Sequence, residues 1–332
     1  MSKLKENIVN DVISVLLPIH GEAPFLKKVI ESIRCQESVE IELVVVLDRP
    51  STLLEAQTEL LLATFQKTKL LVSPGSGISE ALNFGIEHCL GAYIARIDSD
   101  DEMVKDRLIK QKLFLQNNPS ISSVGTQIIK ISEGNKILGK SHYPNRPFLL
   151  GRLIRIRNCV AHPSVMYRRE EVLRVGGYRA TFDGAEDYDL WIRLSRIGRI
   201  ANLNEYLTKY RIWSGQNTAK YMSEKNIRAY HVQLFAELEE IAPHYAIELQ
   251  SKRLNNENLM AAAEEYLRKK AALRWQRLRS LLRLNDTLSR KREILYAKSL
   301  PIVLVCLLRL IVLSVSIRFS RERKRNLNDQ IL

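Results

Sequence analysis

The chain has 332 residues, of which 45% are hydrophobic and 27% charged, and its formal net charge is +14. This length allows one large domain or two modest ones, and the hydrophobic share supports a substantial core and excludes intrinsic disorder. A positive charge of this size is compatible with nucleic acid or an anionic membrane as a partner, so its position along the chain decides what it means.

The positive charge lies almost entirely near the C-terminus. Residues 268–325 hold 17 Lys and Arg against three acidic residues, whereas residues 1–267 hold 34 basic and 33 acidic residues. A nearly neutral body with a basic tail predicts a catalytic or binding domain that attaches to an anionic surface.

The cysteines and the first residues favour the cytosol. The four cysteines lie far apart without metal-ligand spacing, and the first residues contain no apolar run typical of a secretory signal. Together these features predict a reducing, cytoplasmic compartment.

Strand-like apolar runs alternate with helical patterns over the first 130 residues. In chain order, strands and helices are predicted at Val12–Leu17 (strand), Pro24–Cys35 (helix), Ile41–Leu47 (strand), Thr52–Thr68 (helix), Leu70–Val72 (strand), Ser79–Leu90 (helix) and Tyr93–Ile97 (strand). Such repeats with short links imply βαβ crossovers and a mostly parallel, doubly wound α/β sheet.

The pattern changes after residue 121. Shorter strands are predicted at Ile128–Ile131 and Ser164–Tyr167, and one strong helix at Glu186–Ile197. Beyond Asn217 the pattern is helical, including Lys225–Ile241 and Asn255–Leu284. The chain is therefore expected to comprise a catalytic domain over 1–217, a helical extension over 218–298 and a basic-flanked apolar helix over 299–325.

The apolar segment Leu300–Ile317 contains 13 Leu, Ile or Val and one charge, Arg309. On an insertion scale the apolar residues contribute about −4 to −8 kcal/mol and the central arginine costs about 3 kcal/mol, so insertion is marginal. Basic clusters flank both ends, and a spanning helix would place one of them on the wrong side of the membrane. We expect a helix held in the cytoplasmic leaflet by anionic lipid, a spanning helix and a buried helix being the alternatives.

Three carboxylates, Asp98, Asp100 and Asp101, directly follow the strand that ends at Ile97. Open α/β sheets bind ligands at the carboxyl ends of their parallel strands. Carboxylates packed this closely repel one another unless a cation neutralises them, and hard divalent ions prefer such oxygen ligands. The stretch therefore predicts a metal site that could hold a diphosphate; acidic residues in the first turn of a helix are the alternative.

A second acidic pair, Glu186 and Asp187, opens the helix predicted at Glu186–Ile197. Acidic residues at a helix N-terminus are ordinary caps, which is the structural interpretation. The functional interpretation is a general base, which a reaction that deprotonates a hydroxyl nucleophile needs.

Several other enzyme classes are excluded by missing motifs. The run from Gly75 to Glu80 lacks the third glycine of a dinucleotide-binding fingerprint, and no G-K-[ST] phosphate-binding loop exists. The six histidines form no zinc pattern, and no nucleophile elbow occurs. Dehydrogenase, P-loop NTPase and serine hydrolase functions are therefore not expected.

The order of these pieces resembles the family 2 glycosyltransferases with a GT-A fold, and more closely the bacterial surface-polysaccharide transferases of the amylovoran-biosynthesis type. The resemblance covers about residues 10–215. Runs similar to those of the family begin, in order, at Gly77 (GISEALNFG), Tyr93 (YIARIDSDD), Arg107 (RLIKQ), Asn118 (NP), His162 (HPSVM) and Glu186 (EDYDLW). The resemblance implies a GT-A fold, followed here by a helical C-terminal extension.

The resemblance also implies inverting transfer of a sugar from a nucleotide-diphosphate donor to a hydroxyl acceptor. By position, Pro18, His20, Asp48 and Gly77 would contact the nucleotide of the donor. Arg211 would contact its diphosphate.

Metal and base positions are implied in the same way. Asp98 and Asp100 would hold the ribose and Mg²⁺ or Mn²⁺, with Asp101 as a further metal ligand. Asp187 would be the catalytic base, and Glu186 is the alternative.

The chain departs from the family pattern in several places, among them the first loop and the end of the domain. His20 lies where relatives often have an aromatic residue, and Trp213 lies where many have a histidine that can reach the metal. No further metal ligand is therefore assigned, and His162, which precedes a proline, is expected to be structural.

The sequence is thus interpreted as a cytoplasmic, peripheral membrane glycosyltransferase that extends a lipid-linked glycan for O-antigen, capsule or exopolysaccharide, with a UDP-sugar as donor and no nucleic acid as partner. One alternative is a transferase that acts directly on a polyprenyl phosphate. Another is a non-catalytic nucleic-acid or membrane adaptor that uses the basic tail.

Overall fold

The computed structural model describes residues 9–216 and 225–251, together with residues 258, 261 and 265. The chain divides into two compact units, Met1–Met260 and Ala261–Leu332, and the description below concerns the first. The helix predicted at Asn255–Leu284, the apolar segment Leu300–Ile317 and much of the 218–298 extension lie outside the described residues. The predicted domain boundaries stay predictions.

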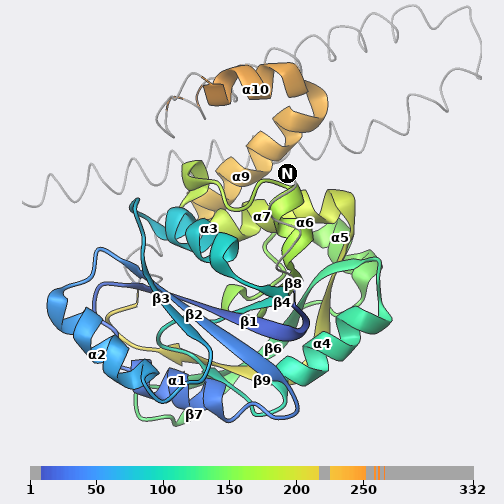
Figure 1. The fold of residues 1–332 in the computed structure, drawn as a ribbon. Coiled ribbons are helices and arrows are strands. Elements are labelled where there is room, and N and C mark those ends of the chain that lie inside the picture. The colour runs from blue at the N-terminus through green and yellow to red at the C-terminus, as the bar shows by residue number, and fades with distance from the viewer. Residues whose placement is uncertain (1–8, 217–224, 252–257, 259–260, 262–264, 266–332) are drawn as a thin grey trace, which may run out of the picture. The chain divides into compact units, whose positions relative to one another are not determined.

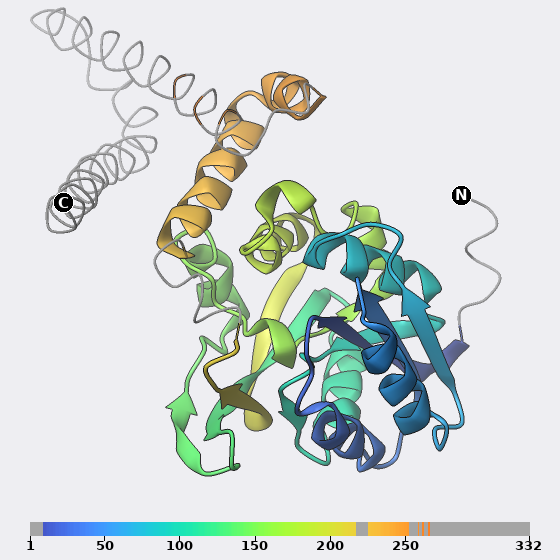
Figure 2. The same ribbon diagram turned by 90° about the vertical axis from the view of Figure 1, so that its left-hand side faces the viewer.

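The described part of the chain alternates strands and helices (Figures 1 and 2). The strands are β1 (Val9–His20), β2 (Glu40–Asp48), β3 (Thr68–Val72), β4 (Gly91–Arg96), β5 (Glu102–Met103), β6 (Ile121–Ser132), β7 (Ile137–Ser141), β8 (Met166–Arg168) and β9 (Arg199–Ile212). The helices are α1 (Leu26–Arg34), α2 (Thr52–Leu62), α3 (Ile78–His88), α4 (Arg107–Asn117), α5 (Pro147–Leu153), α6 (Arg169–Arg174), α7 (Glu186–Ile197), α9 (Lys225–Ile241) and α10 (Pro243–Ser251).

One sheet runs through the domain in the order β3-β2-β1-β4-β8-β6-β9-β5, with β7 paired to β6. The first four strands are parallel, as the βαβ pattern predicts. Beyond β4 the sheet is mixed, because β8 is antiparallel to both β4 and β6 whereas β6 and β9 are parallel. The parallel half leaves the carboxyl ends of β1, β2 and β4 at one edge, where ligands bind in such sheets.

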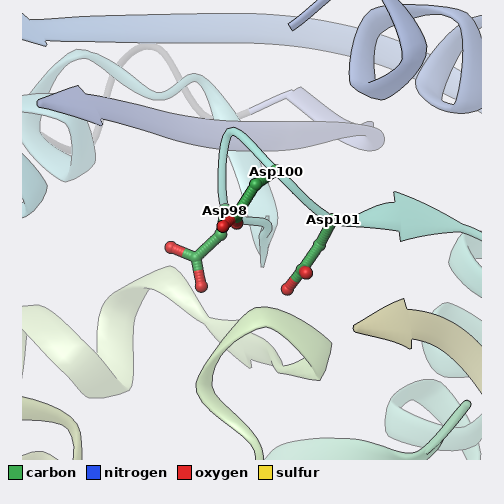
Figure 3. Close-up of side chains that lie close together, drawn as sticks. All are labelled: Asp98, Asp100 and Asp101. Atoms are coloured by element: carbon green, nitrogen blue, oxygen red, sulfur yellow. The ribbon is translucent and has the colours of Figure 1, made fainter. Parts of the chain in front are cut away.

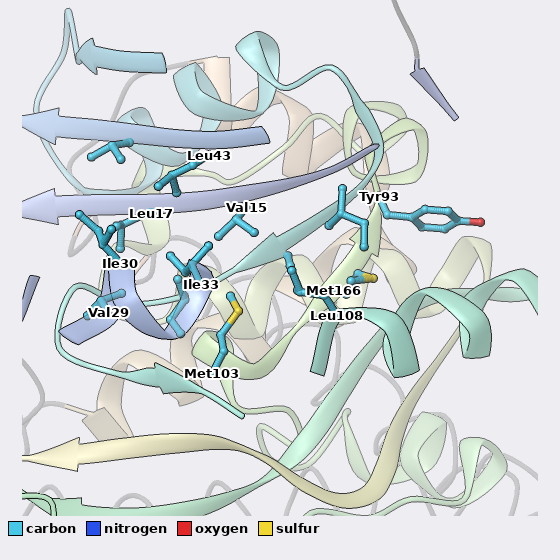
Figure 4. Close-up of a cluster of buried hydrophobic side chains, with 14 of the residues drawn as sticks. Val15, Leu17, Val29, Ile30, Ile33, Leu43, Tyr93, Met103, Leu108 and Met166 are labelled. Atoms are coloured by element: carbon cyan, nitrogen blue, oxygen red, sulfur yellow. The ribbon is translucent and has the colours of Figure 1, made fainter. Parts of the chain in front are cut away.

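The main core lies on one face of this sheet, under α1, α2 and α4 (Figure 4). Alternate residues of β1, among them Val15 and Leu17, face Val29, Ile30 and Ile33 of α1, and all five are buried. Because β-strand side chains alternate between faces, the intervening residues of β1 point the other way.

The opposite face of the sheet carries α3 at very close range. A Cβ built on Gly85 of α3 would collide with Leu16 of β1 and Val46 of β2, so only glycine allows this approach. The close packing brings the N-terminus of α3 to the carboxyl ends of β1 and β2.

Several predicted boundaries change in the second half of the domain. Strands β6 and β9 are long, pairing from Ile121 to Ser132, where only Ile128–Ile131 was predicted and β9 was missed. Residues 162–164 form a 3₁₀ turn before β8 rather than the start of a strand. The mixed polar and apolar composition of β9 (RIANLNEYLTKYRI) explains why no apolar run marked it.

Other boundaries agree with the sequence. The predicted helices Glu186–Ile197 and Lys225–Ile241 are α7 and α9 with the same bounds. The helix predicted at Thr52–Thr68 ends at Leu62, because a turn at Phe65 leads directly into β3.

Helix α9 is joined to the rest of the first unit by ion pairs. Glu239 of α9 binds Arg179 and Arg196, at 2.6 and 2.7 Å, and Phe235 packs against Phe182 with ring centroids 5.5 Å apart. Within residues 9–216 and 225–251, no helix is long and apolar enough to cross a bilayer.

Candidate active site

The first cluster of predicted residues lies where β1 and β2 end. Because β1 and β2 are in parallel register, His20 pairs with Asp48, and His20 Nδ1 lies 2.9 Å from Asp48 Oδ2. The backbone N–H of Gly77, at the start of α3, donates to the same oxygen at 3.0 Å. Asp48 is buried whereas the His20 side chain is 48% exposed, so the histidine forms the accessible side of this cluster. Pro18 is buried within β1.

Gly77 requires its glycine. Its φ of +103° is unfavourable for other residues, and a Cβ there would lie 2.6 Å from Oδ2 of Asp183. The other oxygen of Asp183 accepts a hydrogen bond from the Ser79 hydroxyl, and burial raises the pKa of Asp183. A carboxyl that sequence reasoning missed therefore lies at the first turn of α3.

The acidic cluster Asp98, Asp100 and Asp101 lies on the loop that follows β4 (Figure 3). One carboxylate oxygen from each lies within 4.8 Å of the others. Burial, followed by the charge of Asp98, raises the pKa of Asp100, and burial and the neighbouring Asp100 hold the pKa of Asp101 well above its ordinary range. Both shifts have the direction expected where buried, closely spaced carboxylates repel one another.

The partners of the three carboxylates differ. Both oxygens of Asp98 accept hydrogen bonds from Arg96, and Oδ2 of Asp100 accepts one from Trp213 Nε1 at 2.7 Å. Asp101 is fully buried; its Oδ1 accepts from the Arg211 N–H at 2.8 Å, while its Oδ2 has no hydrogen-bond partner. A buried carboxylate oxygen without a donor fits a divalent cation, since Mg²⁺ and Mn²⁺ take oxygen ligands.

Arg211 lies behind this loop rather than at its surface. Its side chain is fully buried, and it donates to the Asp100 carbonyl at 2.8 Å and to Glu102 Oε1 at 2.6 Å. Its remaining guanidinium nitrogen donates to the backbone carbonyls of Ser132 and Glu133. This geometry supports a role in holding the acidic loop and speaks against direct contact with a diphosphate.

The second acidic pair lies at the first turn of α7. Glu186 is buried, its Oε2 accepts the Gly184 N–H at 2.6 Å, and burial together with the charge of Asp187 raises its pKa to about 8. Asp187 is only partly buried, and its Oδ2 accepts a hydrogen bond from Asn158 Nδ2 at 2.7 Å. The two neighbouring carboxyls therefore occupy different environments, a division typical of acid–base pairs.

His162 is part of the interior beside this pair. It is 8% exposed, its Nε2 lies 2.9 Å from the Tyr178 hydroxyl, and its Nδ1 lies 3.7 Å from Glu186 Oε1. Burial, with a smaller effect from Arg96, holds the pKa of His162 well below its ordinary range. The ring is neutral near pH 7.

Arg96 is a buried cation that pairs with the first acidic set. It is bonded to Asp98 in a two-pronged ion pair, and it is 3% exposed. Burial lowers its pKa, but the charges of Asp98 and Glu186 are among the effects that outweigh burial and raise it. Arg96 is therefore bonded to the cluster that follows β4 and lies within electrostatic range of Glu186, the first residue of α7. Arg96 stands within the family-like run that begins at Tyr93, although no role was assigned to it, whereas Asn158 lies in none of the runs that resemble the family.

Comparison with solved structures shows the same fold. The domain aligns with S. aureus TarS residues 1–349 in complex with UDP-GlcNAc at a TM-score of 0.55 and 19% identity, over 68% of this chain and 66% of that one. It aligns with the mannosyltransferase PcManGT of Pyrobaculum calidifontis, in complex with GDP-Man and Mn²⁺, at a TM-score of 0.52 and 18% identity, over 88% and 80% of the two chains. The fold is therefore of the GT-A type.

Sequence relatives narrow the class further. The profile of glycosyl transferase family 2 matches residues 14–176. The O-antigen biosynthesis glycosyltransferase WbnJ of Escherichia coli is 32% identical over 210 residues, which are 61% of this chain and 80% of WbnJ. The amylovoran biosynthesis glycosyltransferase AmsE of Erwinia amylovora is 29% identical over 208 residues, or 60% and 76%. The chain belongs to glycosyltransferase family 2, within its bacterial surface-polysaccharide branch, as the sequence resemblance predicts.

Proposed function

We propose that this glycosyltransferase moves a sugar, with inversion, from a nucleotide-diphosphate sugar to a hydroxyl of a lipid-linked glycan in O-antigen, capsule or exopolysaccharide biosynthesis. The observation that carries the proposal is the candidate site itself, in which three clustered carboxylates follow β4 and two acids in unlike environments open α7. A transferase needs one set of groups for the leaving diphosphate and another for the acceptor proton, and this site offers both.

The donor would lie across the carboxyl ends of β1, β2 and β4. His20, held by Asp48, offers an exposed imidazole to the nucleobase, and Asp48 is positioned by the Gly77 N–H. A UDP-sugar is the proposed donor; the fold neighbour TarS has been solved with UDP-GlcNAc, which supports this class of ligand.

A divalent cation, Mg²⁺ or Mn²⁺, would be held by Asp98, Asp100 and Asp101. The partnerless oxygen of Asp101 and the raised pKa values of Asp100 and Asp101 support this assignment. When bound, such a cation offsets the negative charge that builds up on the departing diphosphate. Arg211 would act by holding the loop that carries these ligands.

Asp187 is the proposed catalytic base, and Glu186 the alternative. With a pKa of about 8, Glu186 is largely neutral at pH 7 and is therefore the weaker candidate for a proton acceptor, whereas the carboxylate of Asp187 is only partly buried. In one in-line step the acceptor oxygen bonds to the anomeric carbon, the bond from that carbon to the diphosphate oxygen breaks, and Asp187 takes the hydroxyl proton. A single displacement of this kind inverts the anomeric configuration.

Nucleotide release from purified protein tests the catalytic part of the proposal. UDP-, GDP- and dTDP-sugars would be compared in Mg²⁺, Mn²⁺ or EDTA, together with their effects on thermal stability. We expect release from one donor that disappears in EDTA and in Asp100→Ala but persists in Asp106→Ala, a nearby acid that pairs with Lys110. If no nucleotide-sugar stabilises or reacts with the protein, the proposal is rejected.

The membrane part of the proposal concerns residues 299–325, which would keep the enzyme on the cytoplasmic face of the cell membrane. An anchored enzyme meets a lipid-linked acceptor at a raised effective concentration. Removal of residues 299–332 should leave donor hydrolysis intact and weaken transfer to acceptor in vesicles. Equal transfer by the shortened and full chains would contradict this part.

A further inference from the structure

A second basic region lies inside the catalytic domain, far from the C-terminal tail. Residues 134–169 contain eight Lys and Arg and no Asp or Glu. In the middle of this region lies α5 with its flanking residues, and we call residues 146–157 the α5 patch. The near neutrality of the body as a whole therefore conceals a local surplus of positive charge.

The α5 patch presents large apolar side chains to solvent. Phe148, Leu149 and Ile156 are 73%, 46% and 53% exposed, whereas Leu150 and Ile154 are fully buried and anchor the segment to the domain. The buried residues already pack the helix against the domain. The exposed apolar residues contribute nothing to this packing, so another role is expected for them.

Arginines surround these apolar residues, and few of them are neutralised. Arg146, Arg152 and Arg157 are exposed, and within the described residues none of the three forms an ion pair. Arg152 lies over the Phe148 ring, 4.4 Å from its centroid, while Arg155 pairs with Glu240 of α9. Residues 146–157 contain no acid of their own, and three of their four exposed guanidinium groups form no ion pair, which favours an anionic partner.

The α5 patch adjoins the acceptor side of the active site. Arg157 is followed directly by Asn158, whose amide holds the carboxylate of Asp187. In Figure 1, α5 lies on the same side of the sheet as α6 and α7. A surface bound to the patch would therefore lie next to the group that receives the acceptor proton.

We propose that the α5 patch docks on an anionic lipid surface, with Phe148, Leu149 and Ile156 at the boundary between headgroups and acyl chains and the arginines on lipid phosphates. Aromatic and aliphatic side chains beside arginine match this interface in both polarity and charge. The inference rests on the proposed function, because a membrane surface beside Asp187 serves an acceptor that is attached to a lipid. It assigns that contact to the catalytic domain itself, independently of residues 299–325.

A tryptophan reporter in the full chain tests the contact directly. Phe148→Trp would be compared with Leu60→Trp, which alters an equally exposed apolar residue of α2 on the other side of the sheet, 77% exposed. Vesicles of phosphatidylglycerol and phosphatidylcholine with brominated acyl chains quench tryptophans that enter them. We expect brominated vesicles to quench the added fluorescence of Phe148→Trp and not that of Leu60→Trp. Equal quenching of the two, or none, overturns the proposal, as does a Phe148→Trp spectrum that responds to RNA and not to vesicles.

Charge neutralisation provides the second measurement. The triple variant Arg146→Gln, Arg152→Gln, Arg157→Gln would be compared with Lys27→Gln, Lys67→Gln, Lys105→Gln, which removes the same charge from exposed positions elsewhere. Each arginine at an anionic surface contributes roughly fivefold to partitioning. We expect vesicle affinity to fall in the α5 variant and far less in the control, and equal losses would count against the patch.

The two proposals fail in different ways. Nucleotide release from a water-soluble donor without vesicles reports the enzyme, and quenching of Phe148→Trp reports the patch. Quenching without any donor reaction would reject the proposed function and retain the membrane contact, whereas donor reaction without quenching would reject the contact alone.

Discussion

The side-chain amide of Asn158 donates a 2.7 Å hydrogen bond to Oδ2 of Asp187, although the two residues are 29 positions apart. The other oxygen of Asp187 accepts the N–H of Tyr188 at 2.7 Å. Neighbouring donors therefore orient both oxygens of the carboxylate. This orientation would let Asp187 receive a hydrogen bond from the hydroxyl of the sugar acceptor. Asn158 is a positioning residue for the proposed base.

Replacing Asn158 should impair turnover more than donor binding. We expect Asn158→Ala to lower kcat by roughly tenfold to a hundredfold, a part of the roughly 10²–10⁴-fold that a positioned base supplies, with the KM for the donor little changed. Asn158→Asp would place a like charge beside Asp187 and move the acid limb of the pH–rate profile to higher pH. The matched control is Asn202→Ala, which removes hydrogen bonds to Pro144 and Cys159 without touching Asp187. A control as slow as Asn158→Ala, with an unshifted profile, would mean that Asn158 merely supports the loop.

The two acids that open α7 should respond unequally to neutralisation. Asp187→Asn removes the proposed proton acceptor and should lower kcat by roughly 10²–10⁴-fold. Glu186→Gln retains a neutral group of similar shape where burial already favours the neutral acid, so its kcat should stay within roughly tenfold of wild type. Steady-state rates with donor binding measured separately decide the matter, and the reverse order of losses would assign the base to Glu186.

Glu186 also predicts a pH dependence of stability. Folding raises its pKa from 4.5 to about 8, chiefly by burial and then by the charge of Asp187, so the folded protein binds this proton more tightly than the unfolded chain. The resulting stabilisation is full below about pH 4.5 and is lost as the pH rises through about 8. His162 does not offset the negative charge that Glu186 gains at high pH, because burial lowers the pKa of the histidine and keeps its ring neutral.

Thermal melts between pH 6 and pH 9 check this dependence. The Tm of the wild type should fall with rising pH more steeply than that of Glu186→Gln, which has no proton to lose. Glu31→Gln, an exposed acid on α1, serves as control and should keep the wild-type slope. Parallel curves for wild type and Glu186→Gln would disprove the assignment.

Trp213 should report metal binding, because its indole N–H lies 2.7 Å from Asp100 Oδ2. We expect Mn²⁺ with UDP to quench tryptophan fluorescence saturably, EDTA to restore it, and Trp213→Phe to remove most of the response. Asp101→Asn should weaken the Mn²⁺ affinity at least about tenfold, since it removes the one carboxylate oxygen of the cluster that is buried without a partner, whereas Asp106→Asn should not. A response that survives in Trp213→Phe would place the metal elsewhere.

The sequence was most informative where the chemistry is local in the chain. Asp98, Asp100 and Asp101 stand together after an apolar strand, and Glu186 and Asp187 stand together at the start of an amphipathic helix. Each pattern predicted both the acidic residues and the strand or helix next to them, and α7 has the predicted bounds. Strand β9 was missed because polar and apolar residues are mixed irregularly along it without an apolar run, and its position depends on pairing with β6.

The sequence by itself determined the fold class and the two acidic sets, because hydrophobic periodicity and strand ends are local properties of the chain. The family followed separately, from the resemblance of its runs to those of known glycosyltransferases. Only the tertiary structure decided which groups surround those acids. Asn158 reaches Asp187, Trp213 reaches Asp100 and Asp183 reaches Ser79 across 29, 113 and 104 positions.

Arg211 illustrates the same limit of prediction from sequence. The family resemblance predicts that Arg211 lies near the acidic loop. In the structure its guanidinium is buried and bonded to Glu102, so it points inward. Such contacts follow from the packing of β9 beneath the loop. Packing depends on every element at once, so no local pattern can contain it.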